Sequence, residues 1–282
     1  MAHYKGTIEY DGTEFYGFQR QRTGRTVQGV FEEVLSTLNG GLALPIRAAG
    51  RTDSGVHATG QVINFHLTTR LNKNEIKRAL NAMLPKDVAI RDLSNVAPNF
   101  HPRYDAISRV YIYTILNRPI RQPLKNRTSF HVRHPLNEKA MNDAVQRLLG
   151  KHDFASFGRA TSSGGPTIRV MMRASVWREG DLVRIGVEAN GFLYRMVRSI
   201  VGTLLVIGRN QKPPDWIEDV LAARNRSEAG TVVQPQGLCL VAVRYPNSSR
   251  ECLFGAPYCA SPRCELGGIS WDGSRTAPTR KK

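Results

Sequence analysis

One carboxylate lies among small residues in the stretch AAGRTDSGVHATGQV, residues 48–62. Asp53 follows Arg51 by two positions, and the glycines at 50, 55 and 60 allow turns that residues with a Cβ resist. A carboxylate kept ionised by a nearby cation can act as a nucleophile when it lies against an electrophilic carbon. The ordinary alternative is a tight connection in which Asp53 only accepts hydrogen bonds from backbone amides. Asp53 is therefore a candidate catalytic residue, with Arg51 as its neighbour.

The charge balance indicates a polyanionic partner. The 282 residues include 40 Lys and Arg against 23 Asp and Glu, a formal net charge of +17. Cations that neutralise phosphates release condensed counterions, so nucleic acid is the favoured partner. An aspartic protease, which the triplet Asp-Ser-Gly also suggests, is disfavoured by this charge. That mechanism moreover needs two carboxylates sharing a proton, and the triplet occurs once.

Composition bounds the class of protein. A hydrophobic content of 41% suits one large domain or two modest ones. No long uncharged apolar run predicts a membrane span, and the N-terminal residues lack the apolar region of a secretory signal, so we expect a cytoplasmic protein. The four cysteines form no Cys-x-x-Cys pair, which favours free thiols over a metal site. They are Cys239, Cys252, Cys259 and Cys264.

Hydrophobic periodicity predicts the elements that must position Asp53. In the first half we expect strands at 3–12, 44–50, 61–67 and 88–96, with helices at 26–38 and 72–84. In the second half we expect strands at 109–116, two within 168–189 and 238–246, with helices at 137–150, 191–208 and 213–224. The order β-α-β-β-α-β therefore occurs twice.

Two such copies predict an α+β fold of two ferredoxin-like halves, with their sheets side by side and an RNA-binding, active-site cleft between them. We expect an N-terminal domain at 1–105, which carries the Asp53 loop, and a C-terminal domain at 106–246. A flexible basic tail is expected at 247–282, where periodicity is lost. The Gly/Ser-rich stretch 158–169 is expected to be mobile or to close on a ligand.

The stretch AAGRTDSGVHATGQVINF is very similar to the catalytic loop of the tRNA pseudouridine synthase A family. Further motifs resemble that family in the same order. They are YDGTEFYGFQRQ and TVQGVFEEVL, FHPRYDAISRVYIYTI, KHDFASF, NGFLYRMVRSIVGTLLVIG and GLCLVAVRYP. Together the matches run from about residue 4 to residue 246.

The resemblance implies an enzyme that isomerises uridine to pseudouridine at positions 38–40 of the tRNA anticodon stem-loop, without metal or cofactor. In that reaction the N1–C1′ bond breaks, the uracil rotates and C5 rejoins C1′. Asp53 matches the family's catalytic aspartate and is expected to be the nucleophile. Attack on the base and attack on C1′ both remain open, the second having a parallel in retaining glycosidases. A homodimer is implied, with tRNA contacting both subunits.

The resemblance also implies roles for four neighbours of Asp53. Arg51 matches a residue that fills the space left when the target base leaves the stack. Tyr111 matches a tyrosine near the base and could stack on uracil, although its spacing alone fits a packed strand residue. Arg198 matches an arginine that pairs with the aspartate, although alone it would be assigned to a helix rim. Leu238 matches an apolar residue of the uracil pocket, or is plain core.

Weaker expectations concern RNA contacts and the alternative function. Arg20, Arg22 and His57 are expected to contact RNA, although the two arginines equally fit a solvated loop. Tyr194 and Arg195 depart from the family's smaller or histidine-like residues, so the surface there is expected to differ. The alternative is a non-catalytic tandem RRM-like RNA-binding protein, but QVINFHL lacks the spacing of the RRM signature.

Overall fold

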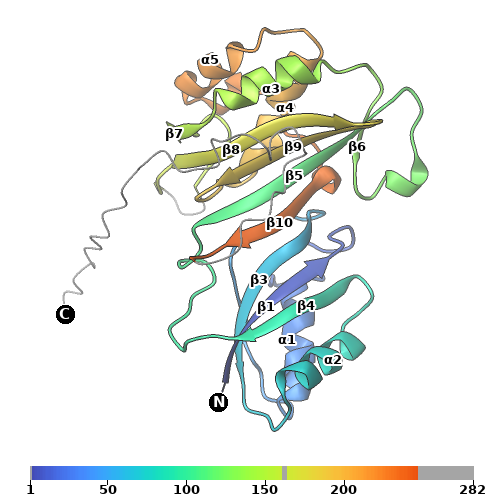
Figure 1. Cartoon of the computed structure of the whole chain (residues 1–282), viewed down its shortest axis with the longest axis vertical. Coiled ribbons are helices and arrows are strands. Elements are labelled where there is room, and N and C mark those ends of the chain that lie inside the picture. The colour runs from blue at the N-terminus through green and yellow to red at the C-terminus, as the bar shows by residue number, and fades with distance from the viewer. Residues whose placement is uncertain (1, 161–163, 247–282) are drawn as a thin grey trace, which may run out of the picture. The chain divides into compact units, whose positions relative to one another are not determined.

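The computed structural model describes residues 2–160 and 164–246, all within one compact unit that spans residues 1–249. The expected flexible tail at 247–282, with three of the four cysteines, lies outside the described residues. The described part is an α+β fold with one mixed ten-stranded sheet and five α-helices (Figure 1). Within it, no helix combines the length and apolar character needed to cross a bilayer.

The first half forms one end of the sheet. Its elements are β1 (Ala2–Tyr10), α1 (Val27–Leu38), β2 (Arg47–Ala48), β3 (His57–Leu67), α2 (Lys73–Met83) and β4 (Val88–Asn95). The strand order is β4-β1-β3, and β2 adds to β3; all these pairs are antiparallel. Figure 1 shows α1 and α2 beside these strands.

Both helices of this half begin at side-chain caps that their sequences provide. Thr26 accepts a hydrogen bond from the backbone N–H of Gly29, as expected of an N-cap threonine. Asn72 and Glu75 form a reciprocal capping box at the start of α2. These caps satisfy backbone donors that the first turn leaves without partners.

The second half continues the sheet with a similar order of elements. They are β5 (Ser108–Asn117), β6 (Phe130–Val132), α3 (Glu138–Gln146), β7 (Gly150–Asp153), β8 (Ile168–Glu179), β9 (Leu182–Ala189), α4 (Met196–Gly208), α5 (Trp216–Ala223) and β10 (Leu238–Arg244). Short 3₁₀ turns lie at η1 (Pro123–Lys125), η2 (Arg226–Glu228) and η3 (Pro235–Gly237). The strand order is β10-β5-β9-β8-β7, with β6 added to β5.

The two halves are joined by strand pairing. β10 pairs in parallel with the start of β3, through Cys239 with His57 and Leu240 with Ala58. Gly60 makes this approach possible, because a Cβ on it would lie only 2.2 Å from the carbonyl oxygen of Val241. Burial raises the pKa of the Cys239 thiol to about 11, so this thiol stays protonated at neutral pH. The sheet therefore runs unbroken across the join.

Three predicted elements are each five residues shorter than expected. The strand expected at 44–50 is reduced to Arg47–Ala48, because Pro45 has no N–H to donate to a neighbour. The helix expected at 191–208 begins at Met196, because Arg195 has a left-handed φ of 61°. The helix expected at 137–150 ends at Gln146, and Gly150 with a φ of 101° begins β7, a strand that the periodicity did not indicate.

Candidate active site

The Asp53 loop is held against the segment that follows β1. The Thr52 hydroxyl hydrogen-bonds the Tyr10 phenol at 2.8 Å, and its carbonyl accepts from the backbone N–H of Phe18 at 3.1 Å. Ser54 donates its hydroxyl hydrogen to the carbonyl of Phe15 at 3.1 Å. Because both residues beside Asp53 are anchored in this way, the direction of the Asp53 side chain is set by the fold.

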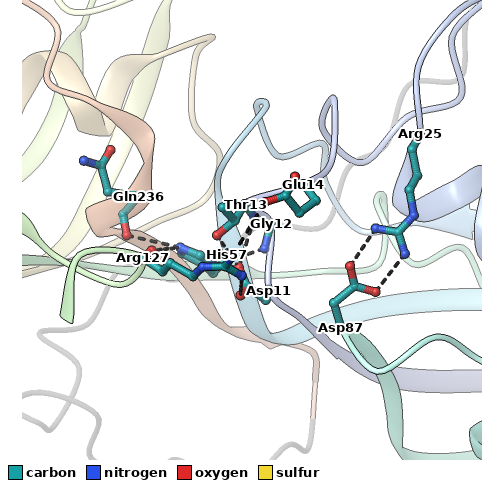
Figure 2. Close-up of polar contacts among 9 residues, drawn as sticks. All are labelled: Asp11, Gly12, Thr13, Glu14, Arg25, His57, Asp87, Arg127 and Gln236. Atoms are coloured by element: carbon teal, nitrogen blue, oxygen red, sulfur yellow. Dashed lines mark hydrogen bonds and ion pairs between the residues drawn. The ribbon is translucent and has the colours of Figure 1, made fainter. Parts of the chain in front are cut away.

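This segment is itself held by Asp87, the residue that precedes β4. Arg25 forms a two-pronged ion pair with Asp87, at 2.6 and 2.8 Å, which Figure 2 shows. Hydrogen bonding to Asp87 raises the pKa of Arg25 above its ordinary value. The same guanidinium lies 4.1 Å from the ring centroid of Phe15. The segment that holds the Asp53 loop is therefore itself fixed in place by this ion pair.

Arg198 holds one oxygen of Asp53. Its Nη1 donates to Asp53 Oδ2 at 2.9 Å, and its Nε donates to the carbonyl of Val233 at 2.8 Å. The Arg198 side chain is 11% exposed and that of Asp53 is 22% exposed. The other oxygen, Oδ1, makes no hydrogen bond within the described part of the chain. Asp53 therefore has one oxygen fixed by a cation and one available to react.

Asp53 opens into a strongly cationic cleft of about 1110 Å³. Seven arginines line the cleft: Arg47, Arg51, Arg103, Arg109, Arg169, Arg195 and Arg198. Among the described residues that line it, Asp53 is the only acid. Cations gathered around a concave surface raise the local concentration of anionic ligands. The cleft is thus suited to a phosphate-rich ligand that places an electrophile beside Asp53.

Apolar residues form the wall beside Asp53. Tyr111 and Leu238 both line the cleft and are almost fully buried. The Tyr111 ring meets Phe192 edge to face, with centroids 5.1 Å apart. Burial, reinforced by the charge of Asp53, raises the pKa of Tyr111, so its phenol stays neutral. The structure thus brings Asp53, Arg51, Tyr111, Arg198 and Leu238 into one cleft.

Arg109 was not among the sequence-based candidates. It is buried, and its guanidinium donates to the carbonyls of Ala49 and Asn190, each at 3.0 Å, and to those of Arg103 and Ala106. Burial lowers the pKa of Arg109, and it forms no ion pair with any described residue. It therefore ties the start of the Asp53 loop to the second half. The available signal was its spacing, because a residue two positions before Tyr111 lies on the same strand face.

His57 is the first residue of β3, and it is not among the residues that line the cleft. Its Nδ1 accepts from the backbone N–H of Gly12 at 3.0 Å, and its Nε2 lies 2.7 Å from the carbonyl of Arg127 and 3.2 Å from that of Gln236 (Figure 2). A carbonyl can only accept, so Nε2 carries a proton, and Nδ1 also lies 3.1 Å from Oδ1 of Asp11. An RNA contact through this ring would have to displace one of these bonds.

The two arginines expected to contact RNA lie on the exposed segment after Phe18. Arg20 is 69% exposed and pairs with Glu32 at 3.3 Å, while Arg22 is exposed. Neither lines the cleft, although the intervening Gln21 does. Their contact with RNA stays a prediction.

No group of three or more His, Cys, Asp or Glu side chains within the described ranges is arranged to hold a metal ion.

Comparison with known proteins gives one consistent result. The family model described as tRNA pseudouridine synthase matches residues 7–105 and 144–246. A tRNA pseudouridine synthase A of Tolumonas auensis is 43% identical over 239 residues, covering 85% of this chain and 91% of that protein. Its counterpart in Geotalea daltonii is 43% identical over 245 residues, 87% of this chain and all of that protein. A tRNA pseudouridine synthase A 2 of Clostridium perfringens is 41% identical, with the same coverage.

Among solved structures, a Cbf5-Nop10-Gar1 complex matches with a TM-score of 0.31 and 15% identity, covering 72% of this chain and 45% of that one. A likeness this remote carries no argument about the cleft.

Proposed function

Because the chain belongs to the tRNA pseudouridine synthase family, we propose that Asp53 is the nucleophile with which this enzyme isomerises uridine in tRNA to pseudouridine. The observation that carries the proposal is the position of Asp53. It is the sole acid among the described residues of a cleft lined by seven arginines, and its Oδ1 has no hydrogen-bond partner there. A carboxylate oxygen without a hydrogen-bond partner can attack an electrophilic carbon of a nucleotide whose phosphates the arginines of the cleft bind.

The proposed reaction needs no atom from outside the nucleotide except exchangeable protons. Oδ1 of Asp53 forms a bond to the nucleotide, at C6 of the base or at C1′ of the sugar. The N1–C1′ bond breaks, the base turns, and C5 bonds to C1′. The proton on C5 leaves, N1 gains a proton, and Asp53 is released, so product and substrate are isomers.

The neighbours of Asp53 have separate proposed roles. Arg198 orients the carboxylate through its 2.9 Å bond to Oδ2. Tyr111 and Leu238 form the apolar wall on which the uracil rests, and base stacking on an aromatic ring is worth about 1–3 kcal/mol. Arg51, which is exposed at the mouth of the cleft, fills the gap left in the RNA stack. Leaving the stack costs a few kcal/mol, which such contacts offset.

The test is replacement of the acid alone. Asp53→Asn and Asp53→Ala are expected to lower pseudouridine formation by at least about 10³-fold while tRNA still binds, since the nucleophile is lost and the cations remain. The assay mixes tRNA with protein and no added cofactor, then detects pseudouridine chemically. Asp181→Asn is the matched control, because Asp181 pairs with Arg118 at 3.0 Å outside the cleft lining.

Substantial isomerisation by either Asp53 variant would end the proposal. A wild-type protein that binds and protects tRNA but leaves its uridines unchanged would instead favour the RRM-like alternative.

The finer expectations belong to the same proposal. We propose uridines 38–40 of the anticodon stem-loop as the targets, a homodimer that contacts tRNA with both subunits, and a cytoplasmic location. We also propose that residues 1–105 and 106–246 are two ferredoxin-like domains. The strand orders β4-β1-β3-β2 and β10-β5-β9-β8 support this, because both follow the order 4-1-3-2 within a β-α-β-β-α-β unit.

A further inference from the structure

An aromatic ring with two arginines lies at the edge of the cleft. The guanidinium carbon of Arg195 is 4.9 Å from the ring centroid of Tyr194, and that of Arg159 is 5.0 Å away. All three side chains are exposed, and Tyr194 and Arg195 line the cleft that contains Asp53. We name these three residues the tyrosine–arginine clamp.

The backbone fixes the clamp in place. The N–H of Tyr194 donates to the carbonyl of Arg159 at 3.0 Å, in an isolated antiparallel bridge. Gly158 permits this approach, because a Cβ there would lie 2.8 Å from the Tyr194 carbonyl oxygen. Arg195 has a left-handed φ of 61°, which costs an L-residue about 1–2 kcal/mol. Strained residues of this kind gather at binding sites, where the surrounding fold holds them.

The N–H groups of both arginine side chains have no partner among the described residues. A guanidinium that lies against an aromatic ring engages its flat face and keeps its N–H groups directed outward. Neither Arg159 nor Arg195 pairs with a carboxylate in the part of the chain that the structure describes. Their two distances to one centroid put the guanidinium carbons no more than about 10 Å apart, where like charges repel. An anion between or beside them would remove that repulsion.

We propose that the tyrosine–arginine clamp binds a backbone phosphate of tRNA adjacent to the nucleotide that reaches Asp53. The inference rests on the proposed function and deepens it. A phosphate fits because the planar edge of arginine matches its oxygens in paired hydrogen bonds. Arg195 directly precedes α4, and Arg198, three residues later, holds Asp53. A phosphate in the clamp is thus placed relative to the nucleophile by the first turn of one helix.

The experiment measures tRNA affinity against salt for the double variant Arg159→Ala/Arg195→Ala. Each lost phosphate contact lowers the slope of log K against log salt by about 0.7–0.9, so the double variant, which loses one phosphate, is expected to lose about that amount. Its Kd at low salt should weaken roughly tenfold. Arg159→Lys/Arg195→Lys should keep the wild-type slope. Tyr194→Phe should behave as wild type, while Tyr194→Leu weakens binding because the guanidiniums lose their support.

Arg147→Ala is the matched control, because Arg147 pairs with Glu218 at 2.8 Å on the α3–α5 surface, outside the cleft lining. It should leave the slope unchanged. A double alanine variant with the wild-type slope would overturn the clamp, whether its Kd is unchanged or is weakened by a purely structural effect. Pseudouridine formation by the wild-type protein on the same tRNA separates the two claims. If that activity is absent the proposed function fails, and if it is present with an unchanged slope only the clamp fails.

Discussion

At the scale of single residues, the chemistry of the cleft depends on how two oxygens of one carboxylate differ. Arg198 engages Oδ2 of Asp53, and Oδ1 is left without a partner among the described residues. Arg198 is itself fixed by its second bond, to the carbonyl of Val233. Arg198 is largely buried and makes two hydrogen bonds, so it keeps Oδ1 of Asp53 pointing in one direction. The conformational entropy needed to orient this oxygen is therefore lost on folding and not in the reaction step.

Replacement of Arg198 tests whether this arginine positions the Asp53 carboxylate. Arg198→Met removes both hydrogen bonds and leaves the Val233 carbonyl and Asp53 without their donor. We expect kcat to fall by roughly 100-fold, about 3 kcal/mol, with a much smaller change in KM, since the cations that bind RNA remain. Arg198→Lys should recover part of kcat because it keeps the charge. Single-turnover kinetics on tRNA make the measurement, and Arg118→Met is the control. A kcat for Arg198→Met within threefold of wild type would contradict the assigned role.

At the scale of elements, periodicity predicted where helices and strands lie better than where they end. The apolar stripes of α1 and α2 and the alternating apolar residues of β3 are local sequence patterns. The N-caps of the two helices, Thr26 and Asn72, are adjacent to them in sequence. The start of α4 could not be predicted in this way, because Tyr194 donates its N–H to Arg159, a partner 35 positions away. Contacts of that kind depend on the finished fold.

The same limit applies to the site. The motif around Asp53 identified the loop, and the family resemblance supplied its partners Arg198 and Tyr111. Arg109 was missed because two of its carbonyl acceptors, Ala49 and Asn190, lie on distant segments that meet only after both halves have folded. The hydrogen bonds that hold the His57 ring outside the cleft were missed for the same reason, since Arg127 and Gln236 are distant in sequence.

The pairing of β3 with β10 gives a prediction about Gly60. Gly60→Ala would place a Cβ 2.2 Å from the carbonyl oxygen of Val241, so the strands that join the halves must separate. We expect the free energy of unfolding in urea to fall by about 2–4 kcal/mol, as for overpacking that backbone cannot relieve. Gly50→Ala is the control for stability, because nothing lies within 4 Å of a Cβ at that position. Equal stability of the two variants would show that the join is looser than the structure indicates.

At the scale of the whole molecule, neutral phenols are concentrated where the two halves meet. Tyr10 lies on β1, Tyr111 and Tyr113 lie on β5, and Tyr245 follows β10. Burial raises the pKa of each phenol well above its ordinary value of about 10. In the folded protein these groups therefore keep their protons at a pH where the unfolded chain loses them.

This difference predicts unfolding by alkali. Above about pH 10 the unfolded state binds fewer protons than the folded state, so stability falls as pH rises, by about 1 kcal/mol per pH unit for each phenol. Urea unfolding between about pH 9 and pH 11, with tyrosinate absorbance as the reporter, measures the slope. Tyr111→Phe should make it roughly a fifth shallower, because it removes one of five linked protons, those of the four phenols and the Cys239 thiol. Tyr104→Phe, at a ring that is 72% exposed, should leave it unchanged. A flat profile, or equal slopes for the Tyr111 variant and wild type, would mean that water reaches these phenols and that the junction between the halves opens in solution.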